Sequence, residues 1–169
     1  DKADQLLDFI NQEKEMLTTS LATADDTPNI YLAGNSSLLS TAGPAMYQSG
    51  IIELAGGKNV ASDISDTYWA EISYEQLLSW NPDYIILASD AEYTVDDVLS
   101  DPNLKDCTAV KNNHVYAIPG DIEALDSPVP ASILASIWLA GILHPDQVST
   151  DTYTKEMNSF YETFYGIKK

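Results

Sequence analysis

The sequence contains no arginine, and its eight lysines face 26 aspartates and glutamates, which gives a formal net charge of −18. A surface that binds nucleic acid needs basic side chains to replace the counterions of the phosphates, so nucleic acid is excluded as a partner. Arginine is also the residue that holds a carboxylate or phosphate by two parallel hydrogen bonds. Without it, an anionic ligand would depend on lysine or on helix N-termini, and a neutral or metal-complexed ligand fits the chain better.

Cysteine and long apolar runs are scarce as well. Cys107 is the single cysteine, which excludes a disulfide framework within the chain and a metal site built from several thiolates. No apolar run approaches the ~20 residues that span a bilayer, and the first residues do not form a signal peptide. The chain opens directly on a helical pattern, with Leu6, Ile10 and Leu17 on one face. We therefore expect it to be an excised or processed part of a longer protein.

The stretch 73–87 has the clearest structural pattern. Ser73 is followed three residues later by Gln76, a pairing that caps a helix N-terminus. Asn81-Pro82 ends the helix, because proline disfavours helical backbone at the residue before it. Residues 84–87, YIIL, are typical of a fully buried strand. A helix, a tight break and a buried strand indicate a parallel α/β layer.

Helical and strand patterns alternate along the whole chain. The pattern predicts strands at 29–33, 59–61, 84–88 and 115–118, and helices at 1–22, 44–55, 73–80, 129–143 and 151–165, with a short acidic helix capped by Thr94. Alternation of this kind predicts one α/β domain with a doubly wound, mostly parallel sheet of four to five strands and helices on both faces. Ligands meet such sheets at the loops that follow the strands, which here are 34–43, 62–72, 89–93 and 119–128.

Residues for catalysis are poorly placed. His114 begins a strand and His144 ends a helix, and neither is paired with a nucleophile and a third orienting group, so both are interpreted as structural. The sequence has no HExxH, no GxxxxGK[ST] and no GxGxxG followed by an acid at the dinucleotide-binding distance. The acidic residues between 90 and 97 lack the spacing of a calcium loop. We expect a binding protein without catalytic residues, cofactor or resident metal; a flavodoxin-like or hydrolase-like enzyme domain is the alternative.

Five segments, in this order and spacing, resemble a known family. They are ELAGGKNVA (53–61), WAEISYEQLL (69–78), NPDYIIL (81–87), DPNLKDCTAVKNNHVYAIPGD (101–121) and SPVPASILASIWLAGILHPD (127–146). Together they resemble the C-terminal lobe of the class III extracytoplasmic solute-binding proteins. These are bilobed receptors, with lobes joined by one long helix, that present ferric siderophores, haem or cobalamin to ATP-powered (ABC) importers.

The resemblance implies a domain organisation, a location and a ligand class. Residues 1–22 would be the end of the bridging helix, residues 23–169 the C-terminal lobe, and the N-terminal lobe would be absent. The parent receptor would work outside the cytoplasm, either in a periplasm or at the cell surface as a lipoprotein. Its ligand would be an iron complex (a siderophore complex or haem) or a corrinoid, with a receptor for bare divalent metal ions as an alternative.

Glu75 is the expected contact with the permease. The helix cap does not need it, and it projects outward if Leu77 and Leu78 project inward. In the resemblance it matches the surface glutamate that this family offers to an arginine pocket on the membrane permease, and Glu71 is the substitute if the register differs. The alternative is an acid that complements the helix dipole, which is a common use of glutamate in a first turn.

Residues of the strand-end loops are the expected ligand contacts. Trp69 matches a cleft-facing aromatic of the family, and Tyr68 lies beside it; a core position is the alternative for Trp69. Asp121 lines up with an acidic cleft residue of the family, whereas Leu125 stands where the family can have an arginine. This departure argues against cobalamin-like recognition and against recognition of a carboxylate.

Serines and one leucine complete the expected cleft. Ser127 is expected to cap a helix that starts at Pro128, so that the free N–H groups of that helix could face the cleft. Four residues of the 34–43 loop could line the same crevice, with turn formation as the alternative: Ser36, Ser37, Leu38 and Ser40. Because half of the cleft is absent, we expect the isolated lobe to bind ligand weakly or not at all.

Overall fold

The computed structural model describes residues 1–64 and 68–168. The strands are β1 Asn29–Ala33, β2 Ser40–Ala42, β3 Lys58–Asn59, β4 Trp69–Glu71, β5 Tyr84–Leu87 and β6 Val115–Ala117. The helices are α1 Lys2–Leu21, α2 Tyr47–Leu54, α3 Tyr74–Trp80, α4 Val95–Leu99, α5 Thr108–Lys111, α6 Ile133–Leu143 and α7 Thr150–Tyr165, with a 3-10 turn, η1, at Pro130–Ser132. Among the described residues, no helix has both the length and the apolar character needed to cross a membrane.

The strands form one mixed sheet in the order β4-β2-β1-β5-β6, with β3 pairing to β1 beside this path. The pairs β1–β5, β5–β6 and β1–β3 are parallel, whereas β1–β2 and β2–β4 are antiparallel. The prediction of an α/β fold with a mostly parallel sheet is therefore confirmed. The antiparallel part is new, because it consists of short strands within the segments 34–43 and 62–72, which were expected to be loops.

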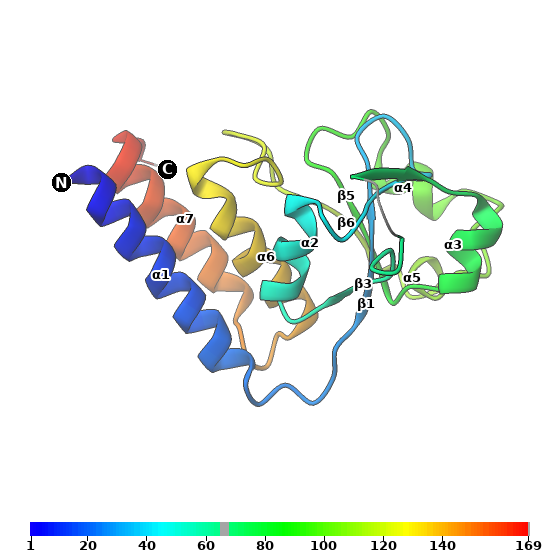
Figure 1. The fold of residues 1–169 in the computed structure, drawn as a ribbon, viewed down its shortest axis with the longest axis horizontal. Helices are drawn as coiled ribbons and strands as arrows, with labels where there is room; N and C mark the ends of the chain where they lie inside the picture. Colours follow the sequence, from blue (N-terminus) through cyan, green and yellow to red (C-terminus); the bar gives the residue numbers. More distant parts are fainter. Residues whose placement is uncertain (65–67, 169) are drawn as a thin grey trace.

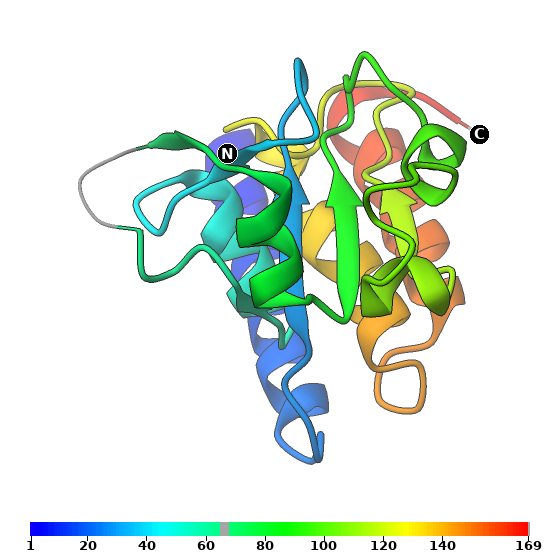
Figure 2. The same cartoon turned by 90° about the vertical axis from the view of Figure 1, so that its right-hand side faces the viewer.

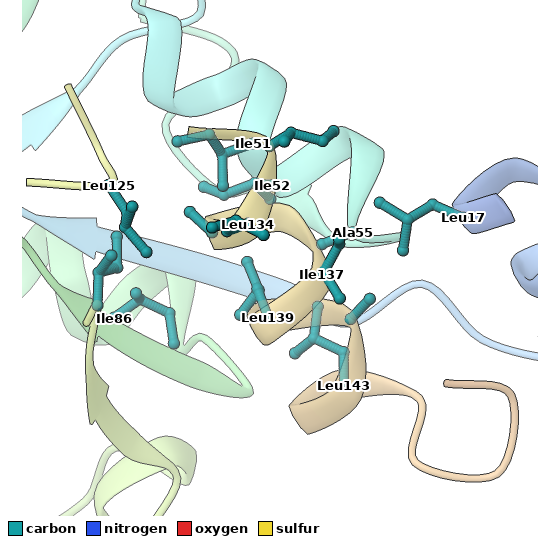
Figure 3. Packing of buried hydrophobic residues seen from close by; sticks show 14 of the residues in the cluster. Leu17, Ile51, Ile52, Ala55, Ile86, Leu125, Leu134, Ile137, Leu139 and Leu143 are labelled. Carbon is teal, nitrogen blue, oxygen red and sulfur yellow. The ribbon is translucent and has the colours of Figure 1, made fainter. Parts of the chain in front are cut away.

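Side chains of β1 and β5 point alternately to two cores, one on each face of the sheet. Ile30, Leu32 and Ile86 belong to the first core, against which α1, α2, α6 and α7 pack. Figure 3 shows α6 in the middle of this core, as expected for a helix with nine of its eleven residues buried. The second core carries α3, α4 and α5 on the opposite face, with the fully buried Cys107 at the start of α5 (Figure 1).

The helix starts predicted at Ser73 and Thr94 are confirmed. The Ser73 hydroxyl accepts a hydrogen bond from the backbone N–H of Gln76 (3.2 Å), and α3 ends at Asn81, whose φ is 44°. At α4, Thr94 and Asp97 form a reciprocal box, since the Thr94 hydroxyl accepts from the Asp97 N–H (3.1 Å) and the Asp97 carboxylate accepts from the Thr94 N–H (2.8 Å).

The start of the long apolar helix differs from the prediction. Ser127 does not cap it, because the first turn is η1 at Pro130–Ser132, with Val129 before it. Pro130 is the physical reason: it holds Val129 in extended backbone (φ −106°, ψ 157°), so the helical turn cannot begin earlier. Ser127 lies instead in a turn, where its backbone N–H donates to the carbonyl of Ala124 (3.0 Å).

Candidate functional site

The loops that follow β1, β5 and β6 meet at one edge of the sheet, because these three strands are parallel (Figure 2). We call this region the carboxyl edge and define it as residues 34–39, 88–93 and 118–126 together with Trp69. Two hydrogen bonds tie its first two loops together. The Tyr93 hydroxyl donates to the carbonyl of Gly34 (2.6 Å), and the Glu92 N–H donates to the carbonyl of Asn35 (2.8 Å).

Asp126 anchors the third loop of the carboxyl edge. Its carboxylate accepts a short hydrogen bond from the Ser89 hydroxyl at the end of β5, and its backbone carbonyl accepts from the side-chain amide of Gln48 in α2 (3.0 Å). Gly120 lies against the same serine, because a Cβ at Gly120 would be 3.0 Å from Ser89 Cβ. The segment 119–126 is therefore held by contacts to two other elements and is not a free loop.

Trp69 lies exposed at the end of β1. Its side chain and that of Tyr68 are 39% and 69% exposed. A Cβ at Gly34 would lie 3.2 Å from Cζ3 of the Trp69 ring, so the indole occupies space that the absence of a side chain at Gly34 provides. Trp69 is therefore partly exposed at the carboxyl edge, and the alternative of a core position is wrong.

Asp121 is exposed at the other end of the same edge, beside α7. Burial, with the charge of Asp121 as a second cause, raises the pKa of Tyr153 in α7. The neighbouring Glu123 accepts a hydrogen bond from the Tyr161 hydroxyl (3.1 Å). Trp69 and Asp121 are not in contact, because β6 lies two strands from β1 and four strands from β4, which carries Trp69; only the Trp69 ring reaches Gly34 at the end of β1.

The other expected ligand contacts are less accessible. Leu125 is 2% exposed and belongs to the first core, and Ser40 is 7% exposed within β2. Ser37 accepts a hydrogen bond from the Leu39 N–H (3.1 Å), and the carbonyl of Leu38 accepts from the Tyr31 hydroxyl (2.6 Å). Leu125 and Ser40 are therefore part of the scaffold, and Ser37 has the turn-forming role that was the alternative.

The carboxyl edge is negatively charged. Its exposed or half-buried acids are Asp90, Glu92, Asp121 and Glu123, and its segments contain no lysine. The sequence pattern gave Asp90 and Glu92 no role beyond excluding a calcium loop, and it did not single out Asp126. The signal for Asp90 and Glu92 was their position directly after the strand at 84–88, because residues that follow a parallel strand lie at this edge.

Both histidines lie away from the carboxyl edge. The ring of His114, just before β6, stacks on Tyr84 with a centroid distance of 4.4 Å. His144 is buried at the end of α6, with Nε2 3.2 Å from the carbonyl of Gly56. Within residues 1–64 and 68–168, no three histidine, cysteine, aspartate or glutamate side chains are grouped so that they could hold a metal ion.

Glu75 is fully exposed in the first turn of α3. Hydrogen bonds from its own backbone N–H and from the Ser73 hydroxyl lower its pKa, so its carboxylate is charged at neutral pH. β4 ends level with β1, because Glu71 pairs with Ser40, whose carbonyl accepts from the Gly34 N–H (2.7 Å). The helix that carries Glu75 therefore starts at the rim of the carboxyl edge.

Comparison with known proteins links this geometry to binding proteins. A family model described as "Periplasmic binding protein" matches residues 1–122. The molybdate-binding protein MolA of Haemophilus influenzae is 28% identical over 167 residues, and the match covers 97% of this chain and 47% of that protein. A cobalamin-binding protein of Halobacterium salinarum is 27% identical over 110 residues, which is 62% of this chain and 29% of that protein.

Solved structures agree with the sequence comparison. A periplasmic solute-binding protein from Veillonella parvula superposes with a TM-score of 0.87 at 26% identity, covering 99% of this chain and 52% of that one. The structure of MolA with bound molybdate superposes with a TM-score of 0.85 at 27% identity, covering 98% of this chain and 51% of that one. The chain thus spans about half the length of the relatives that it matches.

Proposed function

The chain belongs to the periplasmic binding protein family, and we propose that it is the C-terminal lobe of the solute-binding component of an ABC importer. In this proposal α1 is the end of the helix that joins the two lobes, and the carboxyl edge is one wall of the cleft between them. The named relatives are binding proteins, which supports binding and delivery outside the cytoplasm over catalysis. The missing N-terminal lobe would supply the other wall.

The charge of the carboxyl edge supports a ligand that is neutral or cationic overall. The carboxyl edge has four accessible acidic side chains, an exposed tryptophan and no lysine, so an anion would meet like charges without a compensating cation. An indole face suits a large flat or bulky complex. These features favour an iron complex, such as a siderophore complex or haem, or a corrinoid.

An oxyanion is the competing ligand, because the relative from Haemophilus influenzae is named for molybdate binding. To hold a dianion, this lobe would have to use backbone N–H groups as donors. Otherwise the N-terminal lobe would have to supply the compensating positive charge. A metal complex would use the side chains of this lobe, whereas an oxyanion would use its backbone N–H groups or the other lobe. Direct titration with both kinds of ligand can distinguish the two.

The test is isothermal titration of the receptor completed with its N-terminal lobe. The probes are cyanocobalamin, haemin, a neutral ferric trihydroxamate complex and molybdate. We expect one of the metal complexes to bind and molybdate to give no saturable heat. Trp69→Ala should weaken binding at least about fivefold, because a buried aromatic contact contributes about 1 kcal/mol or more.

A matched control separates ligand contact from stability. Tyr165→Ala removes an aromatic side chain that is 48% exposed at the end of α7, away from Trp69, and should leave the affinity unchanged. Tight molybdate binding that survives Trp69→Ala would refute the proposed ligand class. The 169-residue chain alone should bind the same probes weakly or not at all, since half of the contacts are missing.

We further propose that Glu75 contacts the permease. An exposed carboxylate on a rigid helix start can make a charge-assisted contact with a basic pocket at little cost to folding. In reconstituted transport, Glu75→Lys in the complete receptor should reduce uptake while leaving ligand affinity unchanged. The control is Glu15→Lys, an equal charge reversal at an exposed position of α1. Equal uptake by the two variants would refute the proposal that Glu75 contacts the permease.

A further inference from the structure

The indole of Trp69 packs against Gly34, which lies at the end of a different strand. Trp69 begins β4, an edge strand of the sheet that pairs with β2, whereas Gly34 follows β1. A Cβ built on Gly34 would lie 3.2 Å from Cζ3 of the indole and 3.2 Å from both the Cβ and the carbonyl oxygen of Ser40. The backbone at Gly34 is not in the left-handed region, so the close approach of these neighbours is what requires a glycine here.

Of these neighbours, the indole is the one that can move. Ser40 is 7% exposed within β2, and its carbonyl accepts a hydrogen bond from the Gly34 N–H (2.7 Å). Trp69, in contrast, is 39% exposed. A side chain added at Gly34 would therefore displace the ring of Trp69 rather than the strand that carries Ser40.

Tyr93 holds the carbonyl of Gly34 from the loop that follows β5. Its hydroxyl donates to that carbonyl at 2.6 Å, and the neighbouring Glu92 N–H donates to the carbonyl of Asn35 (2.8 Å). Tyr93 is half-buried, and burial raises the pKa of its phenol, so the hydroxyl keeps the proton that it donates. The loop after β5 thus fixes the residue against which the indole packs.

Tyr31 holds the other end of the same loop. It is 0% exposed in the second core, and its hydroxyl donates to the carbonyl of Leu38 (2.6 Å). Burial is the main cause that raises the pKa of Tyr31, and the phenol of Tyr93 is the second, so the two phenols lie near each other. Two tyrosine hydroxyls therefore anchor residues 34–38 at both ends, which restricts the movement of the backbone beside the indole.

We propose that Gly34 and Tyr93 are positioning residues for the ligand contact of Trp69. Tyr93 holds the Gly34 carbonyl, and Gly34 gives the indole a surface without a side chain to pack against. A ring that is already ordered does not have to be immobilised when a ligand arrives, so less of the binding free energy is lost. The link to a ligand rests on the proposed function, whereas the position of the ring can be measured without a ligand.

The first test measures the indole N–H signals of the isotope-labelled 169-residue chain by NMR. The sequence has three tryptophans, and Trp69→Phe identifies the signal of Trp69. Gly34→Ala and Tyr93→Phe should each shift this signal, because the first displaces the ring and the second frees the residue beside it. Gly120→Ala is the matched control on the same edge: its Cβ would meet the end of β5 at 3.0 Å, and the Trp69 signal should stay in place.

The second test is a double-mutant cycle in the receptor completed with its N-terminal lobe. The probes are cyanocobalamin, haemin and a neutral ferric trihydroxamate complex. The probe that binds wild type should bind Gly34→Ala and Tyr93→Phe about fivefold more weakly, because the ligand then has to order the indole. In a Trp69→Ala background neither substitution should cost further affinity, since the ring that they position is gone. Gly50→Ala, which adds a Cβ in open space on α2, controls for the loss of a glycine and should leave the affinity unchanged.

Three results would overturn the proposal. The first is a Trp69 signal that stays in place in both Gly34→Ala and Tyr93→Phe, or that Gly120→Ala shifts equally. The second is wild-type affinity in both variants, and the third is an equal loss of affinity with and without the indole of Trp69. If none of the three probes binds the wild-type receptor, the proposed ligand class fails, and the indole signal alone decides whether Gly34 and Tyr93 position the ring.

Discussion

Replacing Glu13 by glutamine should stabilise the protein at neutral pH but not at acidic pH. Glu13 lies in α1 and is only 8% exposed. Burial, reinforced by the negative charge of Glu156 in α7 and partly opposed by Lys155, raises its pKa from 4.5 to about 6. Above pH 6 the folded protein therefore keeps a charged carboxylate in a place where the protonated form is preferred.

The size and the sign of the effect follow from this shift. A rise of about 1.5 pKa units corresponds to about 2 kcal/mol of lost stability above pH 6, at 1.36 kcal/mol per unit. Between pH 6 and pH 4.5 the folded state binds more protons than the unfolded state, so this loss is relieved as the pH falls. We expect a gain of about 1 kcal/mol for Glu13→Gln at pH 7.5, because the glutamine amide also has to be buried.

The assay is urea unfolding of wild type and Glu13→Gln at pH 4, 5, 6 and 7.5. The gain should shrink through this series and vanish at pH 4. Glu15→Gln, an exposed position on the same helix, controls for the general relief of repulsion in a chain of charge −18. A gain for Glu13→Gln that is the same at all four values, or that Glu15→Gln reproduces, would refute the reasoning.

Three further changes test the packing by urea unfolding at pH 7. Leu77→Ala should cost about 2–5 kcal/mol, because this side chain is 0% exposed in the second core. Thr94→Ala should cost about 1 kcal/mol through loss of the reciprocal cap, and Thr94→Ser should restore most of it. Gly56→Ala should cost about 1–3 kcal/mol, because φ is +80° and the new Cβ would lie 2.7 Å from His144 Nε2; no loss there would contradict the turn geometry.

The helices and the central strands could be predicted because their signals are local. Ser73 and Thr94 each predict a helix start from a cap pattern that spans four residues. The apolar run 84–87 indicates a buried strand by its own composition, without reference to the strands that pair with it. β2 and β4 could not be predicted, because each has three residues and no visible period. Their pairing joins residues about thirty positions apart, as in Ser40 and Glu71.

The candidate site could be predicted in outline but not residue by residue. The loops were found from the strand pattern, and Trp69 and Glu75 are both exposed, as their predicted contact roles require. Whether a loop side chain faces solvent depends on distant contacts, such as the hydrogen bond from Gln48 to the backbone of Asp126, 78 positions away. This hydrogen bond holds the loop in a position in which the side chain of Leu125 points into the first core.

Cys107 allows the opening of one face of this domain to be measured by thiol alkylation. The thiol is completely buried at the start of α5, on the face of the sheet that carries α3 and α4. An alkylating reagent can reach it only when that layer detaches, and no second sulfhydryl competes for the reagent. The alkylation rate under native conditions therefore reports how often this layer opens, either by local detachment or by unfolding of the whole domain.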